Sequence, residues 1–301
     1  MFSERLNLLD ILIDNVFIMK SILLKISVLV LTFLLPVGLN EVENSKSQDF
    51  QGRAIYMSKT KMDLGNWGKG RSEAEIKQIA ARMKNRLEKT YILTFNKTES
   101  IFYEDEKLDA MSGATDSWGK NFVPGRQYKN VKTNSQIQNQ EFYGKQFLVK
   151  DNLQPIEWSL GTETKQIGKY ACFKATASVP TNELTWYDFS WDRLRNAENN
   201  QADSTNVSVE DTVNMTDIEA WYSPQIPVGH GPSEYWGLPG LILEVSYGNT
   251  TMLCTKITMN PEEKIEIEAP DKGKEITKKE YQATITEKMK EFRNNRGRSR
   301  G

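Results

Sequence analysis

The spacing of apolar residues predicts an amphipathic helix near the start of the globular part of the chain. Ser72 and Glu75 have the spacing of a capping box, in which each side chain caps the backbone of the other residue. Behind this box, apolar residues recur three or four positions apart, which is the period of one helix face. These residues are Ile76, Ile79, Ala80, Met83 and Leu87. The pattern predicts a helix over residues 73–89 that buries this face.

A second capping box predicts a helix close to the end of the chain. Thr277 and Glu280 repeat the same spacing. The apolar positions behind them again fall on one helix face, and they are Tyr281, Ile285, Met289 and Phe292. The last residues, 293–301, are basic and include glycine, so we expect a disordered, solvated tail there.

Between the two helices the period changes to the alternation that is typical of strands. Gly248 and Asn249 are a two-residue hairpin signal, and Asn96 with Lys97 marks another turn. Residues 104–140 show no sustained period and are predicted to be a long loop, and 197–206 a mobile insertion. The expected strands are 52–57, 91–95, 100–103, 145–150, 156–160, 165–176, 217–222, 241–247, 251–259 and 264–268.

The order of these elements predicts the fold class. One helix, many strands and a closing helix are typical of an α+β fold with one curved, mainly antiparallel β-sheet. The apolar face of such a sheet must be covered by the helices or by a second layer. We expect a single α+β domain over residues 48–292.

An apolar run near the start of the chain predicts export. Residues 26–37 are apolar and follow Lys20 and Lys25, which is the pattern of a secretory signal peptide. A membrane-spanning helix needs about 20 apolar residues, which is more than this run provides. We expect a signal peptide and spacer over 19–47 and a mature protein in the periplasm or at the cell surface. An uncleaved N-terminal anchor is the alternative.

The first 18 residues do not fit this signal. Glu4, Asp10 and Asp14 are acidic, whereas the start of a signal peptide is cationic. We therefore expect the signal peptide to start near Met19.

Charge and composition exclude several functional classes. The 301 residues include 39 Lys and Arg and 40 Asp and Glu, so the even balance gives no reason to expect a nucleic-acid partner. One His and two Cys are too few for a His-rich zinc site or a four-Cys cluster, and we expect no metal and no cofactor. In an oxidising compartment, Cys172 and Cys254 are expected to form a disulfide. Two separate buried thiols are the alternative.

The densest unusual stretch is 223–240, which contains three prolines and is expected to be extended and stiff. Its Leu-Pro-Gly-Leu sequence at 238–241 predicts a type II turn. His230, the only imidazole, is either a catalytic base or a loop residue allowed by its flanking glycines. Glu244, with Asp217 and Glu219, is either part of a carboxylate pair for glycoside chemistry or an ordinary polar strand position. We assign no catalytic residue.

Aromatic residues concentrate near the same stretch. They could line a groove for an apolar ligand or a peptide, or they could form the core of the sheet. The three groups are 186–191, 221–222 and 235–236.

The motif in this stretch resembles the GLPGLI family of exported Bacteroidota proteins. The motif residues are Gly237, Leu238, Pro239, Gly240, Leu241 and Ile242, followed by Glu244. Residues 220–227, 167–172 and 96–102 are similar to other parts of that family, so the resemblance covers about 49–292. The family has no established biochemical activity, so the resemblance implies export but no reaction. At the level of the fold, the strands also resemble the half-barrels of lipoprotein-localisation carriers (LolA-like), which hold acyl chains.

These observations lead to three functional hypotheses. The first is a non-enzymatic envelope protein that binds a lipid-like or apolar ligand on its curved sheet, with 223–240 as a rigid lip. The second is a protein-interaction module of the envelope that uses this loop, and the third is a hydrolase that uses His230 or Glu244. The residues expected to contact the ligand or partner are Trp221, Tyr222, His230, Tyr235, Trp236 and Leu238.

Overall fold

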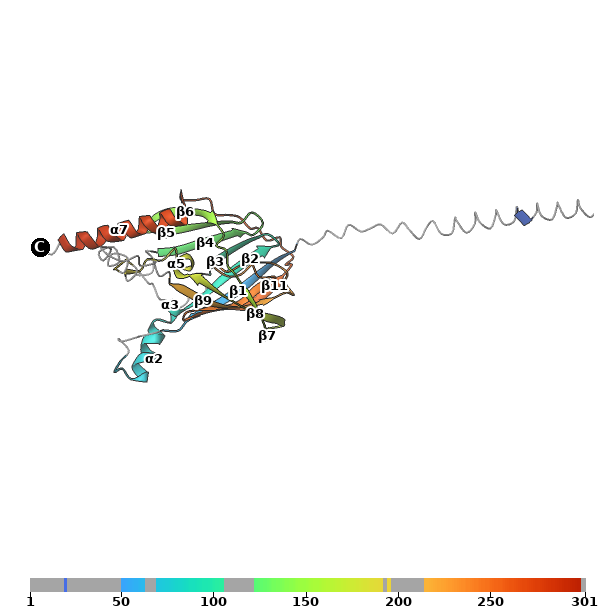
Figure 1. The fold of residues 1–301 in the computed structure, drawn as a ribbon, viewed down its shortest axis with the longest axis horizontal. Helices are drawn as coiled ribbons and strands as arrows, with labels where there is room; N and C mark the ends of the chain where they lie inside the picture. Colours follow the sequence, from blue (N-terminus) through green and yellow to red (C-terminus); the bar gives the residue numbers. More distant parts are fainter. Residues whose placement is uncertain are drawn as a thin grey trace, which may run out of the picture. The chain divides into compact units, whose positions relative to one another are not determined.

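The computed structural model describes residues 19–20, 50–62, 69–105, 122–191, 194–195 and 214–298 (Figure 1). The chain divides into two units, Met1–Gln48 and Asp49–Gly301. Of the first unit only Met19 and Lys20 are described, so the first 18 residues and the rest of the expected signal peptide and spacer lie outside the described residues. The same holds for the insertion at 197–206. None of the described helices combines the length and apolarity needed to cross a membrane.

Within the described residues, the second unit is built on a 12-stranded sheet (Figure 1). Strands that neighbour one another pair antiparallel, except that β12 runs parallel to β6. Their order is β12-β6-β5-β4-β3-β2-β1-β11-β10-β9-β8-β7. The strands are β1 (Gln51–Thr60), β2 (Glu88–Asn96), β3 (Glu99–Glu104), β4 (Phe122–Asn130), β5 (Ser135–Phe142), β6 (Lys145–Asn152), β7 (Ser159–Ile167), β8 (Tyr170–Pro180), β9 (Met215–Ser223), β10 (Leu241–Tyr247), β11 (Thr250–Met259) and β12 (Lys274–Ile276).

The expected fold class is confirmed: a mainly antiparallel sheet with few helices and a helix at its C-terminal end. The helices are α2 (Glu73–Arg82), α3 (Lys84–Leu87), α5 (Thr181–Leu184) and α7 (Lys278–Arg298). The hairpins expected at Asn96 and at Gly248 join β2 to β3 and β10 to β11.

The first helix forms with the expected cap but is shorter and less buried than its sequence predicts. The hydroxyl of Ser72 accepts from the Glu75 backbone N–H at 3.3 Å, and the Glu75 carboxylate accepts from the Ser72 N–H at 2.8 Å. The helix ends at Arg82, and none of its residues is buried. The expected helix over 73–89 is interrupted at Met83, continues as α3 over Lys84–Leu87, and ends before Glu88, where β2 pairs with β1.

The closing helix α7 matches its prediction more closely. The Thr277 hydroxyl accepts from the Glu280 N–H at 3.2 Å, and the Glu280 carboxylate accepts from the Thr277 N–H at 2.8 Å. Tyr281, Ile285 and Met289 are buried in a cluster that includes side chains of β5 and β6. The helix continues to Arg298, so the stretch from 293 that we expected to be a disordered tail is helical to that point.

Four expected assignments are wrong. In the strand expected over 156–160, residues 156–158 are not in a strand and β7 begins only at Ser159. The loop predicted over 104–140 contains β4 and β5, because glutamines occupy inward positions of β5 and mask the alternation of apolar residues. The single strand predicted over 165–176 is a hairpin of β7 and β8 that turns at Gly168, whose φ of 57° suits glycine. Residues 264–268 form no strand, and the last strand is β12.

The segment between β9 and β10, residues 224–240, covers part of the sheet and is called the inner segment below. Its apolar residues pack into the main core, together with side chains of β1, β2, β8 and β10. The hydroxyl of Tyr56 on β1 donates to the Ile242 carbonyl at 2.6 Å, just beyond the segment. The stretch that we expected to be an exposed lip thus contributes apolar side chains to the hydrophobic core.

Candidate functional site

The residues expected to contact a ligand or a partner are mostly core residues. The exposed fractions of His230, Tyr235 and Leu238 are 0%, 2% and 2%. Trp221 and Tyr222 are also buried, and only Trp236 is half-buried. The expectation of a lip that exposes these side chains is therefore wrong, since their apolar surface is buried in the core.

Trp236 is fixed at both its indole and its backbone. Its indole N–H donates to the Gln154 carbonyl at 2.7 Å, and its own carbonyl accepts from the Trp158 indole at 2.8 Å. Trp221 points elsewhere, because its ring lies under the Lys165 amine at 4.2 Å. The two tryptophans therefore anchor different parts of the fold and do not form a common apolar surface.

Close packing and backbone conformation explain three glycines of the inner segment. A Cβ on Gly240 would lie 2.3 Å from the Ser223 carbonyl oxygen, and a Cβ on Gly231 would lie 2.8 Å from the Tyr235 carbonyl oxygen. Gly237 has a φ of 93°, which favours glycine. Gly240 is not among the glycines with positive φ, so the type II turn expected at 238–241 is wrong.

His230 is buried, and its imidazole contacts a backbone carbonyl. Its Nε2 lies 3.1 Å from the Asn96 carbonyl oxygen, which can only accept, so Nε2 carries the proton. Burial, and to a smaller extent the charge of the nearby Lys129, lower the pKa of the imidazole to about 3, although the hydrogen bond to Asn96 opposes this shift. No described residue hydrogen-bonds Nδ1. Without an orienting carboxylate or a nucleophile at its nitrogens, the ring lacks the partners that acid–base catalysis needs.

The carboxylates singled out in the sequence do not form a catalytic pair. Glu244 lies 2.8 Å from the Lys165 amine. Glu219 accepts from the Trp221 indole at 2.9 Å and lies 2.9 Å from the Lys174 amine, and these hydrogen bonds lower the pKa of Glu219. Both are strand carboxylates held by lysines, which matches the simpler of the two interpretations.

Cys172 and Cys254 are separate buried thiols, so the expected disulfide is wrong. Cys172 lies on β8 and Cys254 on β11, and β9 and β10 run between these strands. Strands about 4.8 Å apart place the two backbones well beyond the roughly 4.4–6.8 Å between Cα atoms that a disulfide requires. Burial raises the pKa of Cys172 to about 11 and that of Cys254 to about 12, so both are thiols at neutral pH.

The structure reveals a buried polar cluster around Glu234 that our sequence interpretation missed. The carboxylate is 3% exposed, and its Oε1 accepts three hydrogen bonds. The donors are the amide of Gln127 at 2.6 Å, the amide of Gln136 at 3.0 Å and the indole of Trp186 at 3.0 Å. The Lys278 amine of α7 lies 3.4 Å from Oε2. The cluster thus ties the inner segment to β4, β5 and α7.

Lys129 on β4 fixes the same part of the inner segment. The side chain is fully buried, and its amine donates to the carbonyls of Gly231, Ser233 and Tyr235 at 2.9, 2.6 and 3.3 Å. Burial lowers the pKa of this amine to about 7, while the Glu234 carboxylate opposes the shift. The backbone on both sides of Glu234 is therefore held by a single buried amine.

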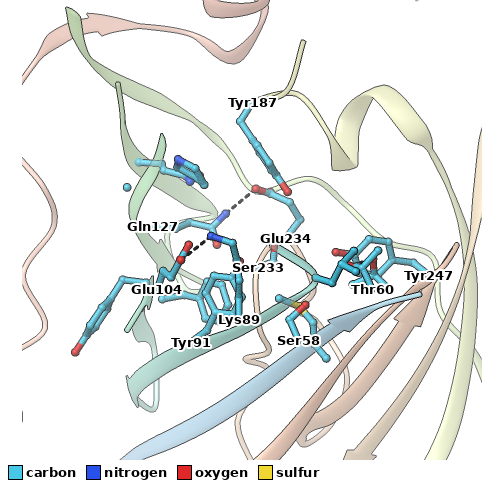
Figure 2. A pocket seen from close by; sticks show the side chains of 18 residues that line it. Ser58, Thr60, Lys89, Tyr91, Glu104, Gln127, Tyr187, Ser233, Glu234 and Tyr247 are labelled. Atoms are coloured by element: carbon cyan, nitrogen blue, oxygen red, sulfur yellow. Dashed lines mark hydrogen bonds and ion pairs between the residues drawn. The ribbon is translucent and has the colours of Figure 1, made fainter. Parts of the chain in front are cut away.

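A cavity of about 220 Å³ lies beside this cluster (Figure 2). One part of its wall is polar and includes Gln127 and Glu234, which Figure 2 shows joined by a hydrogen bond. Another part is aromatic, where the rings of Tyr91 and Phe102 stack with centroids 4.9 Å apart. The remaining lining residues are Ser58, Thr60, Leu87, Lys89, Tyr103, Glu104, Pro124, Gly125, Gln138, Tyr187, Ser233, Tyr247, Thr250 and Met252.

The cavity lining contains one ion pair and one buried amide oxygen without a partner in the part of the chain that the structure describes. Lys89 and Glu104 pair with one another at 2.6 Å, and their partial exposure places them toward the solvent side. Oε1 of Gln127 has no hydrogen-bond partner among the described residues, although the side chain is only 2% exposed. Within the same described ranges, no group of three or more His, Cys, Asp or Glu side chains is arranged to hold a metal ion.

The stretch that contains Glu234 and the inner segment has a counterpart among known families. Residues 158–244 match the family described as "Protein of unknown function (Porph_ging)". The match runs from just before β7 into β10 and includes the whole inner segment. No curated protein matches the chain.

Among solved structures, the chain is similar to PNGF-II. The structure in the C2 space group has a TM-score of 0.44 and 16% identity, over 78% of this chain and 32% of that chain. The structure in the P21 space group has a TM-score of 0.40 and 16% identity, over 74% and 29%. The chain therefore covers less than a third of the length of either match.

Proposed function

We propose that this protein is an exported, non-enzymatic member of the GLPGLI family that binds a small amphipathic molecule in the cavity beside Glu234. The apolar run at 26–37 supports export, and the sequence Gly-Leu-Pro-Gly-Leu-Ile at 237–242 supports the family. The cavity itself carries the proposal of binding, because a buried side chain on its wall, Gln127, has an oxygen that no described residue satisfies.

The size of the cavity limits the ligand. A cavity of about 150 Å³ holds benzene, and drug-sized ligands occupy about 300–1,000 Å³. At about 220 Å³, this cavity accommodates a ring with a substituent. Its mixture of stacked rings and buried polar groups favours an amphipathic molecule over a purely apolar one.

The two other hypotheses gain no support from specific contacts. A protein-interaction module using 223–240 would need that segment at the surface, but most of its apolar side chains are in the core. A hydrolase using His230 or Glu244 would need partners that neither residue has: His230 contacts a backbone carbonyl, and Glu244 contacts a lysine.

Native mass spectrometry of the chain, expressed and processed in its own host, tests the proposal. We expect excess mass that disappears on organic extraction and corresponds to a small molecule rather than a phospholipid. A bare polypeptide mass at concentrations that preserve noncovalent complexes would contradict the proposal.

Two matched variants locate the bound mass. Ser58→Phe places a ring in the cavity from a buried position on β1, and we expect it to abolish the excess mass. Met57→Phe adds a ring at the next position, which faces the other side of the sheet and is 40% exposed, and it should retain the excess mass. Equal retention by both variants would place the molecule elsewhere.

A further inference from the structure

The orientation of the Gln127 side chain shows that the polar part of the cavity wall lacks a hydrogen-bond donor. Its Nε2 donates to Glu234 Oε1 at 2.6 Å. A carboxylate only accepts, so the amide nitrogen must face Glu234 and the orientation of the amide is fixed. Oε1 therefore points away from Glu234 and remains without a donor among the described residues.

Such an atom is uncommon in folded proteins. Most buried polar atoms have a hydrogen-bond partner in the protein or in bound water, and an exception on a cavity wall points to a missing donor. The missing group must bring an N–H or an O–H, because Oε1 of an amide has no hydrogen to donate.

Two lysines near this cluster, Lys129 and Lys278, are engaged by other acceptors, and Lys89 on the cavity wall pairs with Glu104 at 2.6 Å. The Lys129 amine donates to three backbone carbonyls, and the Lys278 amine donates to Gln136 Oε1 at 3.0 Å and lies beside Glu234. Because these two amines already lie near the Glu234 carboxylate, the cluster does not require a cationic ligand to balance its charge. A carboxylate ligand would place its oxygens against acceptor oxygens and would be rejected.

The aromatic wall defines the rest of the ligand. The stacked rings of Tyr91 and Phe102 and the side chain of Met252 all line the cavity and make this part of its wall apolar. Aromatic rings and methionine sulfur both contact ring-shaped ligands favourably.

Resting on the proposed function, we propose that the ligand is a neutral ring compound whose N–H or O–H donates a hydrogen bond to Gln127 Oε1. The cavity discriminates by this donor: it accepts neutral heteroaromatic amines, phenols or amides and rejects both carboxylates and rings without a donor.

Isothermal titration of the full chain with three fragments tests this proposal. Indole has the donor, 1-methylindole lacks it, and 3-methylindole keeps the donor while adding the same methyl group. We expect indole and 3-methylindole to bind about tenfold more tightly than 1-methylindole, as a hydrogen bond to an otherwise unpaired buried acceptor implies. Similar affinities of indole and 1-methylindole would overturn the inference.

Gln127→Met and Gln138→Met provide a matched pair of variants. The two glutamines face one another across β4 and β5, both line the cavity and both are buried, but Gln138 Oε1 accepts from Gln136 at 3.5 Å. We expect Gln127→Met to bind indole and 1-methylindole equally and Gln138→Met to retain the tenfold preference. Retained preference in Gln127→Met would overturn the inference. If that variant does not fold, the affinities of the three fragments for the unmodified chain still decide whether a donor is required.

The outcomes separate this inference from the proposed function. Binding of all three fragments with equal affinity overturns the inference but keeps the cavity as a binding site. Binding of none overturns the inference, and the excess mass in native mass spectrometry then decides whether the proposed function fails with it.

Discussion

Lys129→Met tests whether a buried amine supports the inner segment. The ordinary pKa of a lysine is 10.5, and burial lowers that of Lys129 to about 7 in the folded protein. Between these values the unfolded chain binds more protons than the folded chain. The free energy of unfolding therefore rises with pH in this window, by up to about 1.4 kcal/mol per pH unit.

The window from pH 7 to 8.5 gives the clearest signal. Integrating the two titrations over this window predicts that the Lys129 amine adds about 1.6 kcal/mol to the free energy of unfolding. From about pH 7.5 upward the unfolded cysteines ionise, since their ordinary pKa is about 8.5, whereas Cys172 and Cys254 stay protonated in the fold, and this opposes the gain. Comparison with the variant cancels such contributions, since they are common to both proteins.

Urea denaturation at pH 7.0, 7.75 and 8.5 measures this difference directly. We expect the unmodified chain to gain about 1.6 kcal/mol more than Lys129→Met over the series. Lys132→Met removes an exposed lysine just beyond the same strand and should behave like the unmodified chain. Parallel pH dependences for the unmodified chain and Lys129→Met would refute the reasoning, because the amine would then titrate alike in the folded and unfolded chains.

Three further predictions concern other buried positions. Thiol titration of the denatured, unreduced chain should detect both Cys172 and Cys254, and detection of neither would restore the disulfide. Burial lowers the pKa of His230 to about 3, so the unfolded chain binds more protons between pH 3 and 6.5 and stability falls on acidification. His230→Gln should therefore lose about 2 kcal/mol less than the unmodified chain between pH 7 and pH 5 in urea denaturation; an equal loss would contradict this. Gly240→Ala should lower the melting temperature strongly because its Cβ would meet the Ser223 carbonyl at 2.3 Å, and an unchanged melting temperature would show that the backbone yields there.

The sequence predicts elements well where a local signal is strong. Both capping boxes form as expected, since each depends on two side chains and the backbone between them. The hairpin at Gly248 forms for the same reason. Strands β4 and β5 were missed because Gln127, Gln136, Gln138 and Gln140 occupy buried positions, where the alternation of apolar residues would normally reveal a strand.

The candidate site depends on contacts that are distant in sequence. Gln127 and Glu234 are separated by 107 positions, and neither belongs to a motif that indicates binding. The sequence left open whether the aromatic residues at 186–191, 221–222 and 235–236 line a groove or form a core, because periodicity alone does not decide between the two. The repeated glutamines of β5 were the available signal, because polar residues at every second position of a strand can face a buried polar cluster.

A crystal structure of the chain purified from its own host tests the central claim most directly. We predict electron density for a ring compound in the cavity between Met252 and Glu234, with a nitrogen or oxygen of the compound within hydrogen-bond distance of Gln127 Oε1. A cavity that contains only ordered water, with one water donating to Gln127 Oε1, would contradict the account.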